Sequence, residues 1–179
     1  MRTGRRTALW IMVAMLAPAA TARAADDLRV RPTVADKLVV VSFELDDAYT
    51  AAVKEAISSG LKTTFTYDLE LRTKSAVWMD RTVATSTITI TDQYDNLMRR
   101  HTLTRAIDGR VEEVTVTEDE AVVRAWLTKA TRVPLCETAK LDATRDYYVR
   151  VTTRTRPVTG SMLGLQRTFS TQTRFTFIP

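Results

Sequence analysis

Two side chains of this 179-residue chain have the chemistry of a nucleophilic catalytic pair, and each residue type occurs only once. A thiolate next to an imidazole is such a pair, so Cys136 and His101 are candidates if folding brings them together. However, Cys136 ends the apolar stretch 133–136, which is typical of a buried and unreactive thiol. His101 falls at the start of a predicted strand. We therefore interpret both as structural residues, and an envelope hydrolase is the third of our functional hypotheses.

Clustered carboxylates are the other candidates for acid–base or metal chemistry. The pair Asp46/Asp47 and the run Glu118–Glu120 stand at predicted helix starts, where acids stabilise the helix dipole. Zinc sites need several His or Cys ligands at short spacing, and the sequence has no such spacing. It also has no nucleophile elbow, phosphate loop or dinucleotide fingerprint. We expect no metal, no cofactor and no enzymatic activity.

Aromatic, acidic and basic side chains are mixed most densely in two segments that flank a predicted strand. Tyr, Trp and Arg are the residues that protein interfaces use most. We therefore predict a recognition edge formed by Trp78, Asp80, Arg81, Tyr94, Asp95, Arg99 and Arg100. A purely structural interpretation stays open, in which these residues form a turn and a strand end with local ion pairs.

Arginines accumulate at the end of the chain, where residues 147–179 contain five of them and no acid. Residues of the same parity point to the same side of a strand. We therefore predict a basic interaction surface formed by Arg150, Arg154, Arg156 and Arg174. An anionic lipid headgroup, a glycan or an acidic envelope protein would suit it. Alternatively, these arginines only keep a sheet edge soluble.

Strands must position most of these residues, because polar and apolar side chains alternate along much of the chain. In Leu61–Thr73 the odd positions are mainly apolar and all the even ones are polar. Such one-sided burial is typical of antiparallel sheets. Asp108-Gly109 is a strong hairpin signal. The other predicted strands are Lys37–Leu45, Thr82–Thr91, His101–Ile107, Val111–Val116, Tyr147–Arg156 and Leu165–Phe177.

Helical spacing replaces this alternation in two segments. Asp47–Ser59 has Asp46 or Asp47 as its N-cap and Gly60 in the C′ position. Glu118–Ala130 has a capping box of Thr117 and Glu120, and its apolar stripe consists of Val122, Val123, Trp126 and Leu127. The predicted fold is a single soluble α+β domain over residues 25–179, mainly antiparallel β with sandwich-like sheet packing and two short amphipathic helices.

The first 24 residues read as a cleavable signal peptide. Basic residues precede the apolar run 8–17, and small residues end at Ala24. Ten apolar residues are fewer than the roughly 20 that a membrane span needs, so we expect no transmembrane span in the mature chain. A retained anchor and twin-arginine export stay open as alternatives. The prediction is export to the periplasm or cell envelope of a bacterium.

Removing the leader changes the charge of the chain. Four of the 26 Lys and Arg residues lie in the leader, which leaves 22 basic against 21 acidic side chains. The basic isoelectric point is therefore largely a property of the discarded segment, and it gives no support to nucleic-acid binding.

Several segments between Leu38 and Val151, taken in order, resemble a known family. They are Ser59-Gly60-Leu61, Phe65–Leu71, the Trp78/Asp80 pair, Tyr94–Leu97 followed by Arg99 and Arg100, Glu120–Leu127, and Tyr147–Val151. This order is similar to that of the bacterial domain of unknown function 4390. The resemblance implies an exported envelope protein without an assigned activity, so it supplies no catalytic residue.

The functional prediction is a non-enzymatic binding or accessory module of the cell envelope. Its partner would be an envelope protein, a glycan or an anionic lipid headgroup. The alternative is a carrier that holds an apolar or lipid ligand in a cavity between the sheet and the helices.

Overall fold

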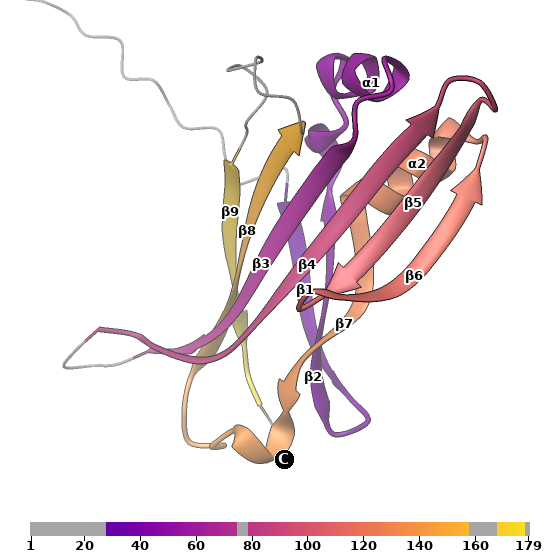
Figure 1. The fold of residues 1–179 in the computed structure, drawn as a ribbon. Coiled ribbons are helices and arrows are strands. Elements are labelled where there is room, and N and C mark those ends of the chain that lie inside the picture. Colours follow the sequence, from indigo (N-terminus) through magenta and orange to yellow (C-terminus); the bar gives the residue numbers. More distant parts are fainter. Residues whose placement is uncertain (1–27, 75–78, 158–167, 178–179) are drawn as a thin grey trace, which may run out of the picture.

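The computed structural model describes residues 28–74, 79–157 and 168–177, so the predicted signal peptide lies outside the described residues. Figure 1 shows two antiparallel sheets, one of six strands in the order β6-β5-β4-β3-β8-β9 and one of three in the order β1-β2-β7. This confirms the predicted architecture of mainly antiparallel β structure with two short helices. No helix within the described residues is long and apolar enough to cross a membrane.

The elements follow one another along the chain with short connections. Their bounds are β1 Leu28–Ala35, β2 Leu38–Leu45, α1 Ala51–Ser58, β3 Thr63–Thr73, β4 Arg81–Asp95, β5 Arg100–Ile107, β6 Arg110–Thr117, α2 Glu120–Thr128, β7 Lys129–Glu137, β8 Tyr147–Pro157 and β9 Thr168–Phe175. Two 3-10 turns, Asp46–Ala48 and Thr138–Lys140, follow β2 and β7.

Strand β3 runs through the middle of the larger sheet and shows the predicted alternation without interruption. Every odd residue from Thr63 to Thr73 is buried, and every even one is partly exposed. The buried residues define the inner face of the six-stranded sheet, and the even residues of β3 lie on its outer face. The two-residue period of the sequence therefore set the register of this strand correctly.

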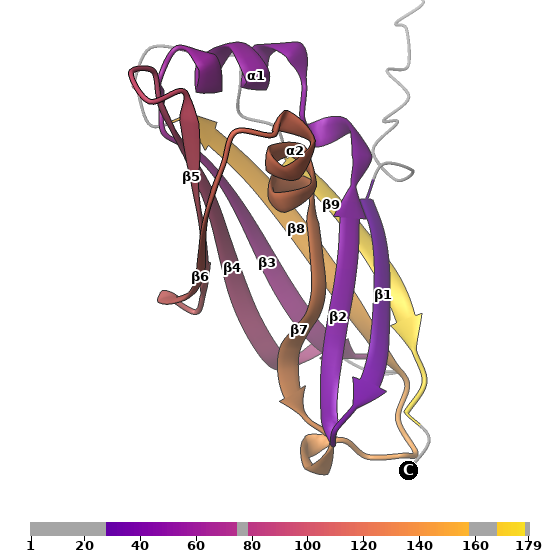
Figure 2. The same cartoon turned by 90° about the vertical axis from the view of Figure 1, so that its right-hand side faces the viewer.

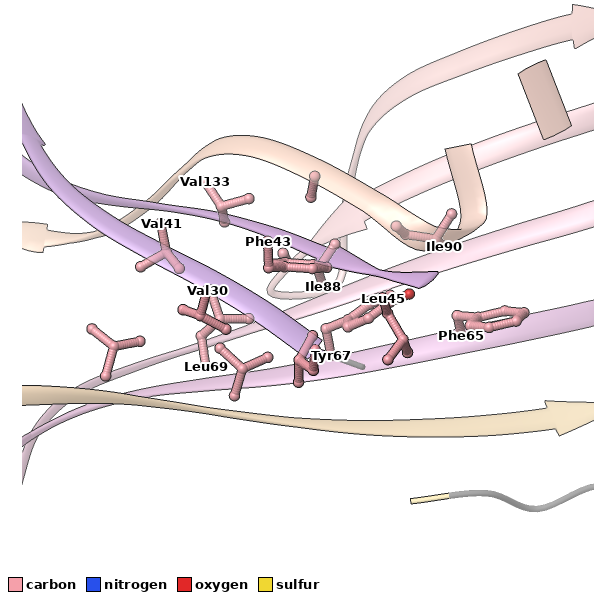
Figure 3. Packing of buried hydrophobic residues seen from close by; sticks show 14 of the residues in the cluster. Val30, Val41, Phe43, Leu45, Phe65, Tyr67, Leu69, Ile88, Ile90 and Val133 are labelled. Carbon is pink, nitrogen blue, oxygen red and sulfur yellow. The ribbon is translucent and has the colours of Figure 1, made fainter. Parts of the chain in front are cut away.

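The core lies between the inner face and the three-stranded sheet, as Figure 3 shows. The Phe43 ring of β2 packs 4.4 Å from the Tyr67 ring of β3, measured between centroids. The Tyr67 hydroxyl donates a hydrogen bond of 2.5 Å to the Leu127 carbonyl oxygen, which ties α2 to the sheet. Burial raises the pKa of Tyr67, so this hydroxyl keeps its proton.

The two sheets close on one side and diverge on the other. Strands β1 and β9 lie side by side, and Thr173 Oγ1 donates a 3.4 Å hydrogen bond to the Val30 carbonyl oxygen. On the opposite side β6 and β7 separate, and α2 fills the upper part of the gap (Figure 2). Val123 and Leu127 of α2 are fully buried there.

Both predicted helix starts were wrong by a few residues. Helix α1 begins at Ala51, because the Thr50 side chain accepts the hydrogen bond from the Val53 amide; the aspartates before it form a separate 3-10 turn. Helix α2 begins at Glu120 with Asp119 as its N-cap. The predicted capping box is absent, because the Thr117 hydroxyl instead accepts from the Asp119 amide, one residue before Glu120.

The sequence patterns missed two strands of the smaller sheet. Helix α2 ends at Thr128, and the residues assigned to its last turn already belong to β7. β7 contains Pro134 and has register shifts against β2, so its alternation is broken. β1 alternates only in its first half, where Leu28 and Val30 are buried. Val122 of the predicted apolar stripe is exposed, whereas Val123 and Leu127 carry the packing of α2.

Candidate functional site

The inner face of β4 changes from apolar to polar toward the end of the sheet where α1 and α2 lie, which we call the helical end. Ile88 and Ile90 are fully buried in the core, and the next residue in the same phase is Asp92, also 0% exposed. Tyr94 follows, directly opposite His101 of β5. A buried carboxylate costs free energy unless polar partners compensate it. This end of the face is therefore the first place to look for a site.

His101 compensates the buried carboxylate. Its Nδ1 lies 2.9 and 3.2 Å from the two oxygens of Asp92. Burial raises the pKa of Asp92, and the hydrogen bond from His101 opposes that shift. In the tautomer in which Nδ1 donates to the carboxylate, Nε2 is the acceptor. The pair therefore fixes the orientation of the imidazole, and in this tautomer Nε2 is the acceptor nitrogen.

Two tyrosines stand beside this pair. The Tyr94 ring packs on the imidazole of His101 with centroids 4.5 Å apart. Tyr49 precedes α1, and its pKa is raised to about 12, first by burial and then by the negative charges of Glu120 and Asp92. Its hydroxyl is thus protonated near neutral pH, and it can donate as well as accept a hydrogen bond.

Tyr49, Tyr94 and His101 line a surface pocket of about 470 Å³. Its walls come from α1, the turn between β4 and β5, and the start of α2. Lys54 of α1 and Glu120 of α2 form an ion pair of 2.7 Å across the two helices. Arg99 and Glu118 add one further charge of each sign, so the formal charges of the lining residues cancel when His101 is neutral. We call this hollow the Tyr–His pocket; it is lined by Tyr49, Lys54, Ile57, Ser58, Tyr94, Met98, Arg99, His101, Glu118 and Glu120.

Glycine at position 60 fixes α1 against the β4–β5 turn. Gly60 has a φ of +83° and follows the C-cap, as predicted, with the Leu61 amide donating back to the Ala56 carbonyl oxygen. A Cβ at this position would lie 2.9 Å from Asn96 Nδ2. The Gln93 side chain also donates to the Gly60 carbonyl oxygen at 3.1 Å. The pocket wall thus depends on a close approach of backbone and turn.

The family model described as "Domain of unknown function (DUF4390)" matches residues 24–163. The chain belongs to the DUF4390 family. The matched range includes every residue that lines the Tyr–His pocket. No curated protein and no solved structure matches the chain.

The predicted recognition edge of this DUF4390 domain is divided between the two ends of β4. Tyr94 and Arg99 line the Tyr–His pocket. Asp95 shapes the turn, since its Oδ1 accepts from the amides of Leu97 and Met98 at 2.8 and 2.9 Å. Arg100 is exposed beside this turn.

Asp80 and Arg81 lie at the other end of β4, a strand of 15 residues. At about 3.3 Å per residue this end is roughly 45 Å from the pocket. Asp80 accepts a 2.7 Å hydrogen bond from the Tyr148 hydroxyl. Trp78 lies outside the described residues. Asp80 and Arg81 therefore do not share a site with Tyr94 and Arg99.

Arg150, Arg154 and Arg174 lie on the outer face of the six-stranded sheet. Arg150 lies opposite Glu70 of β3, with 3.8 Å between Nη1 and Oε2, and Arg154 forms an ion pair with Asp68. Arg174 is exposed opposite Tyr148 on β8. The backbone of Arg156 pairs with Thr64, and its side chain lies outside the described part. Acids of β3, distant in sequence, thus compensate part of the predicted basic surface.

The single cysteine is not near the histidine. Cys136 is buried close to the far end of β7, opposite Val39, and burial raises the pKa of its thiol. His101 is at the helical end, where β5 begins (Figure 2). Within the described ranges no cluster of three or more His, Cys, Asp or Glu side chains could hold a metal ion.

Asp92, the residue that orients His101, was not among the site residues predicted from the sequence. The predicted strand Thr82–Thr91 stopped one residue before it, whereas β4 continues to Asp95. Extending the even phase of Ile88 and Ile90 by one step would have placed an acid on the inner face. Tyr49, Lys54 and Glu120 gave no comparable signal, because only the packing of α1 and α2 brings them to the pocket.

Proposed function

We propose that this chain is an exported, non-enzymatic binding module of the bacterial cell envelope, and that the Tyr–His pocket binds a neutral saccharide. One observation carries this proposal: the buried Asp92 binds Nδ1 of His101, which lines a pocket beside two tyrosines, and the formal charges of that pocket cancel. The N-terminal signal pattern supports export.

The side chains of the pocket match the chemistry of a sugar ring. Sugars present C–H faces that pack on aromatic rings, and hydroxyls that both donate and accept hydrogen bonds. Tyr49 and Tyr94 supply rings, His101 Nε2 supplies an acceptor, and the charged groups of the rim supply further donors and acceptors. The pocket volume also falls within the range of roughly 300–1,000 Å³ that is usual for small-molecule sites.

Charge favours a neutral ligand over an anionic headgroup. Lys54 is already paired with Glu120, and Glu118 adds a second acid to the lining. An anion would therefore meet as much negative as positive charge. On the outer face, Arg150 and Arg154 are likewise paired with acids of β3. The exposed arginines thus give less support to a headgroup than their number suggests.

A calorimetric titration of the processed protein with the trimer of β-1,4-linked N-acetylglucosamine tests this proposal. Tyr94→Ala should weaken binding by at least about tenfold, the equivalent of about 1.4 kcal/mol. Tyr148→Phe, which removes a tyrosine hydroxyl at the distant end of β4, is the matched control and should bind as the wild type does. Equal affinity of all three proteins would contradict the pocket assignment.

Two other functions, a hydrolase and a lipid carrier, predict different experimental results. The Asp92–His101 pair is also how enzymes orient a general base, so a hydrolase would cleave the trimer and lose this activity in His101→Ala. A carrier would retain lipid, which native mass spectrometry of the purified protein would detect. If the protein bound phosphatidylglycerol vesicles and did not bind the trimer, the binding site would be the predicted arginine surface and not the Tyr–His pocket.

A further inference from the structure

Two charged side chains of the Tyr–His pocket have no partner of their own. Arg99 and Glu118 line the pocket, and neither forms a side-chain hydrogen bond or an ion pair with another residue that the structure describes. The lysine and the other glutamate of the lining, Lys54 and Glu120, are already joined at 2.7 Å. The pocket therefore presents one free cation and one free anion to a ligand.

These two charges come from different parts of the fold. Arg99 belongs to the turn between β4 and β5, and Glu118 belongs to the short connection between β6 and α2. Both residues are exposed, and no ion pair joins them although their charges are opposite. A ligand group can therefore form a charge-assisted hydrogen bond with each of them without displacing an existing ion pair.

The backbone at Arg99 is unfavourable for an arginine. Its φ of +56° lies in the left-handed region, which glycine and asparagine adopt more readily. The Asp95 carboxylate helps to hold this turn, because its Oδ1 accepts from the amides of Leu97 and Met98. Backbone strain of this kind is concentrated at functional sites. The cation that Arg99 supplies to the pocket gives this strain a functional reason.

We propose that the Tyr–His pocket selects a saccharide that carries one ammonium and one carboxylate group. This inference rests on the proposed saccharide site and narrows its ligand, which stays neutral overall. The Arg99 guanidinium binds the carboxylate, since its planar fork matches two oxygens, and the Glu118 carboxylate binds the ammonium group. A purely anionic or purely cationic sugar would be attracted by one of these residues and repelled by the other.

Four sugars separate the two charges of the ligand. Muramic acid carries both the amine and the carboxylate, N-acetylmuramic acid only the carboxylate, glucosamine only the amine, and N-acetylglucosamine neither. Titrations at neutral pH, followed by nuclear magnetic resonance, measure the affinity of each sugar. Muramic acid should bind about tenfold more tightly than N-acetylglucosamine, because each of two solvent-accessible ion pairs contributes about threefold. The two singly charged sugars should bind less tightly than muramic acid.

Substitutions on the protein assign each charge to its residue. Arg99→Asn suits the left-handed backbone, so it should not lower the midpoint of urea unfolding, and it should remove the advantage of muramic acid over glucosamine. Glu118→Gln should remove the advantage of muramic acid over N-acetylmuramic acid. Arg100→Gln and Glu55→Gln are the matched controls, since both residues are exposed and neither lines the pocket. They should leave all four affinities unchanged.

The outcomes distinguish this inference from the saccharide site itself. Equal binding of all four sugars to a wild type that binds the N-acetylglucosamine trimer would overturn the inference and leave the site intact. Tightest binding of N-acetylmuramic acid or of glucosamine would also overturn it, since the pocket would then select a net charge. Arg99→Asn and Glu118→Gln variants that weaken all four sugars alike would reject the assigned contacts. If neither the sugars nor the trimer bind, the proposed function fails and this inference fails with it.

Discussion

The middle and one end of the inner face of the six-stranded sheet are equally buried but differ in polarity. In the middle of the inner face, Ile88 and Ile90 face the ring cluster of Phe43 and Tyr67, and polar atoms are few. One step further along the same strand phase, Asp92 is just as buried but requires a partner. The strand pattern explains an inward side chain at both ends. An acid there needs a separate explanation, and the proposed saccharide site supplies one.

The elements that cover the middle and the end of this face also differ in polarity. The three-stranded sheet covers the middle with apolar side chains, whereas the two helices cover the end and contribute an ion pair between Lys54 and Glu120. Because strands give continuous packing and helix ends leave gaps, the Tyr–His pocket forms beside the two helices.

The largest effect is expected in the core. Phe43→Ala removes a ring that is 4% exposed and packed on Tyr67, so it should lower the free energy of unfolding by about 3–5 kcal/mol. Urea denaturation measures this change. Leu97→Ala, at a side chain that is 96% exposed, is the control and should change it by less than about 0.5 kcal/mol. A small effect of Phe43→Ala would mean that the two sheets do not share this core.

The polar end should respond differently, because its charges serve the site more than the fold. Replacing both partners, Asp92→Leu with His101→Phe, should leave stability unchanged or raise it by about 1–4 kcal/mol. The same protein should lose saccharide binding. His101→Ala alone should destabilise by about 1–3 kcal/mol, since it leaves a buried carboxylate without its hydrogen bond. A double variant less stable than the single one would show that the pair is structural.

Gly60→Ala tests the connection between the helix and the turn that form the pocket wall. Alanine at a φ of +83° is strained, and its Cβ would meet Asn96. The expected loss is about 1–2 kcal/mol in thermal or urea unfolding. Saccharide affinity should fall as well, since the wall would shift. Unchanged stability would mean that the β4–β5 turn can shift away from α1 without a cost in free energy.

The pH dependence is the smallest expected difference. Burial raises the pKa of Asp92 above its ordinary value of 3.8, so the folded state binds its proton more tightly than the unfolded state does. Stability from this group is therefore greatest at low pH, and it falls as pH rises from about 3.8 through the folded pKa. The stability of the wild type relative to Asp92→Asn should decrease over that interval. A constant or rising difference would contradict the assigned burial.

The sequence correctly predicted those elements that depend on local signals, namely the alternation of side chains in strands and the residues of turns. The strands from β3 to β6, the Asp108-Gly109 hairpin and the position of Gly60 are confirmed. The helix starts were wrong because several neighbouring side chains could cap, and packing chose among Thr50, Asp119 and their neighbours.

The site could be predicted only in part, because its residues meet through tertiary packing. Tyr94 and Arg99 stood out by their type, but Asp92 fell one residue beyond the predicted strand. The arginines of β8 appeared unopposed in the sequence, whereas strand pairing places Asp68 and Glu70 beside them. Contacts between strands distant in the chain are the information that a local pattern lacks.

The most direct test of the saccharide site is a nitrogen-15 spectrum of the histidine ring, which is unambiguous because the chain has a single histidine. In the free protein at neutral pH, Nδ1 should carry the proton and Nε2 should not. Saturation with the N-acetylglucosamine trimer should move the Nε2 resonance far more than that of Nδ1. A proton on Nε2 in the free protein, or a ring that does not respond to the trimer, would contradict the proposed site.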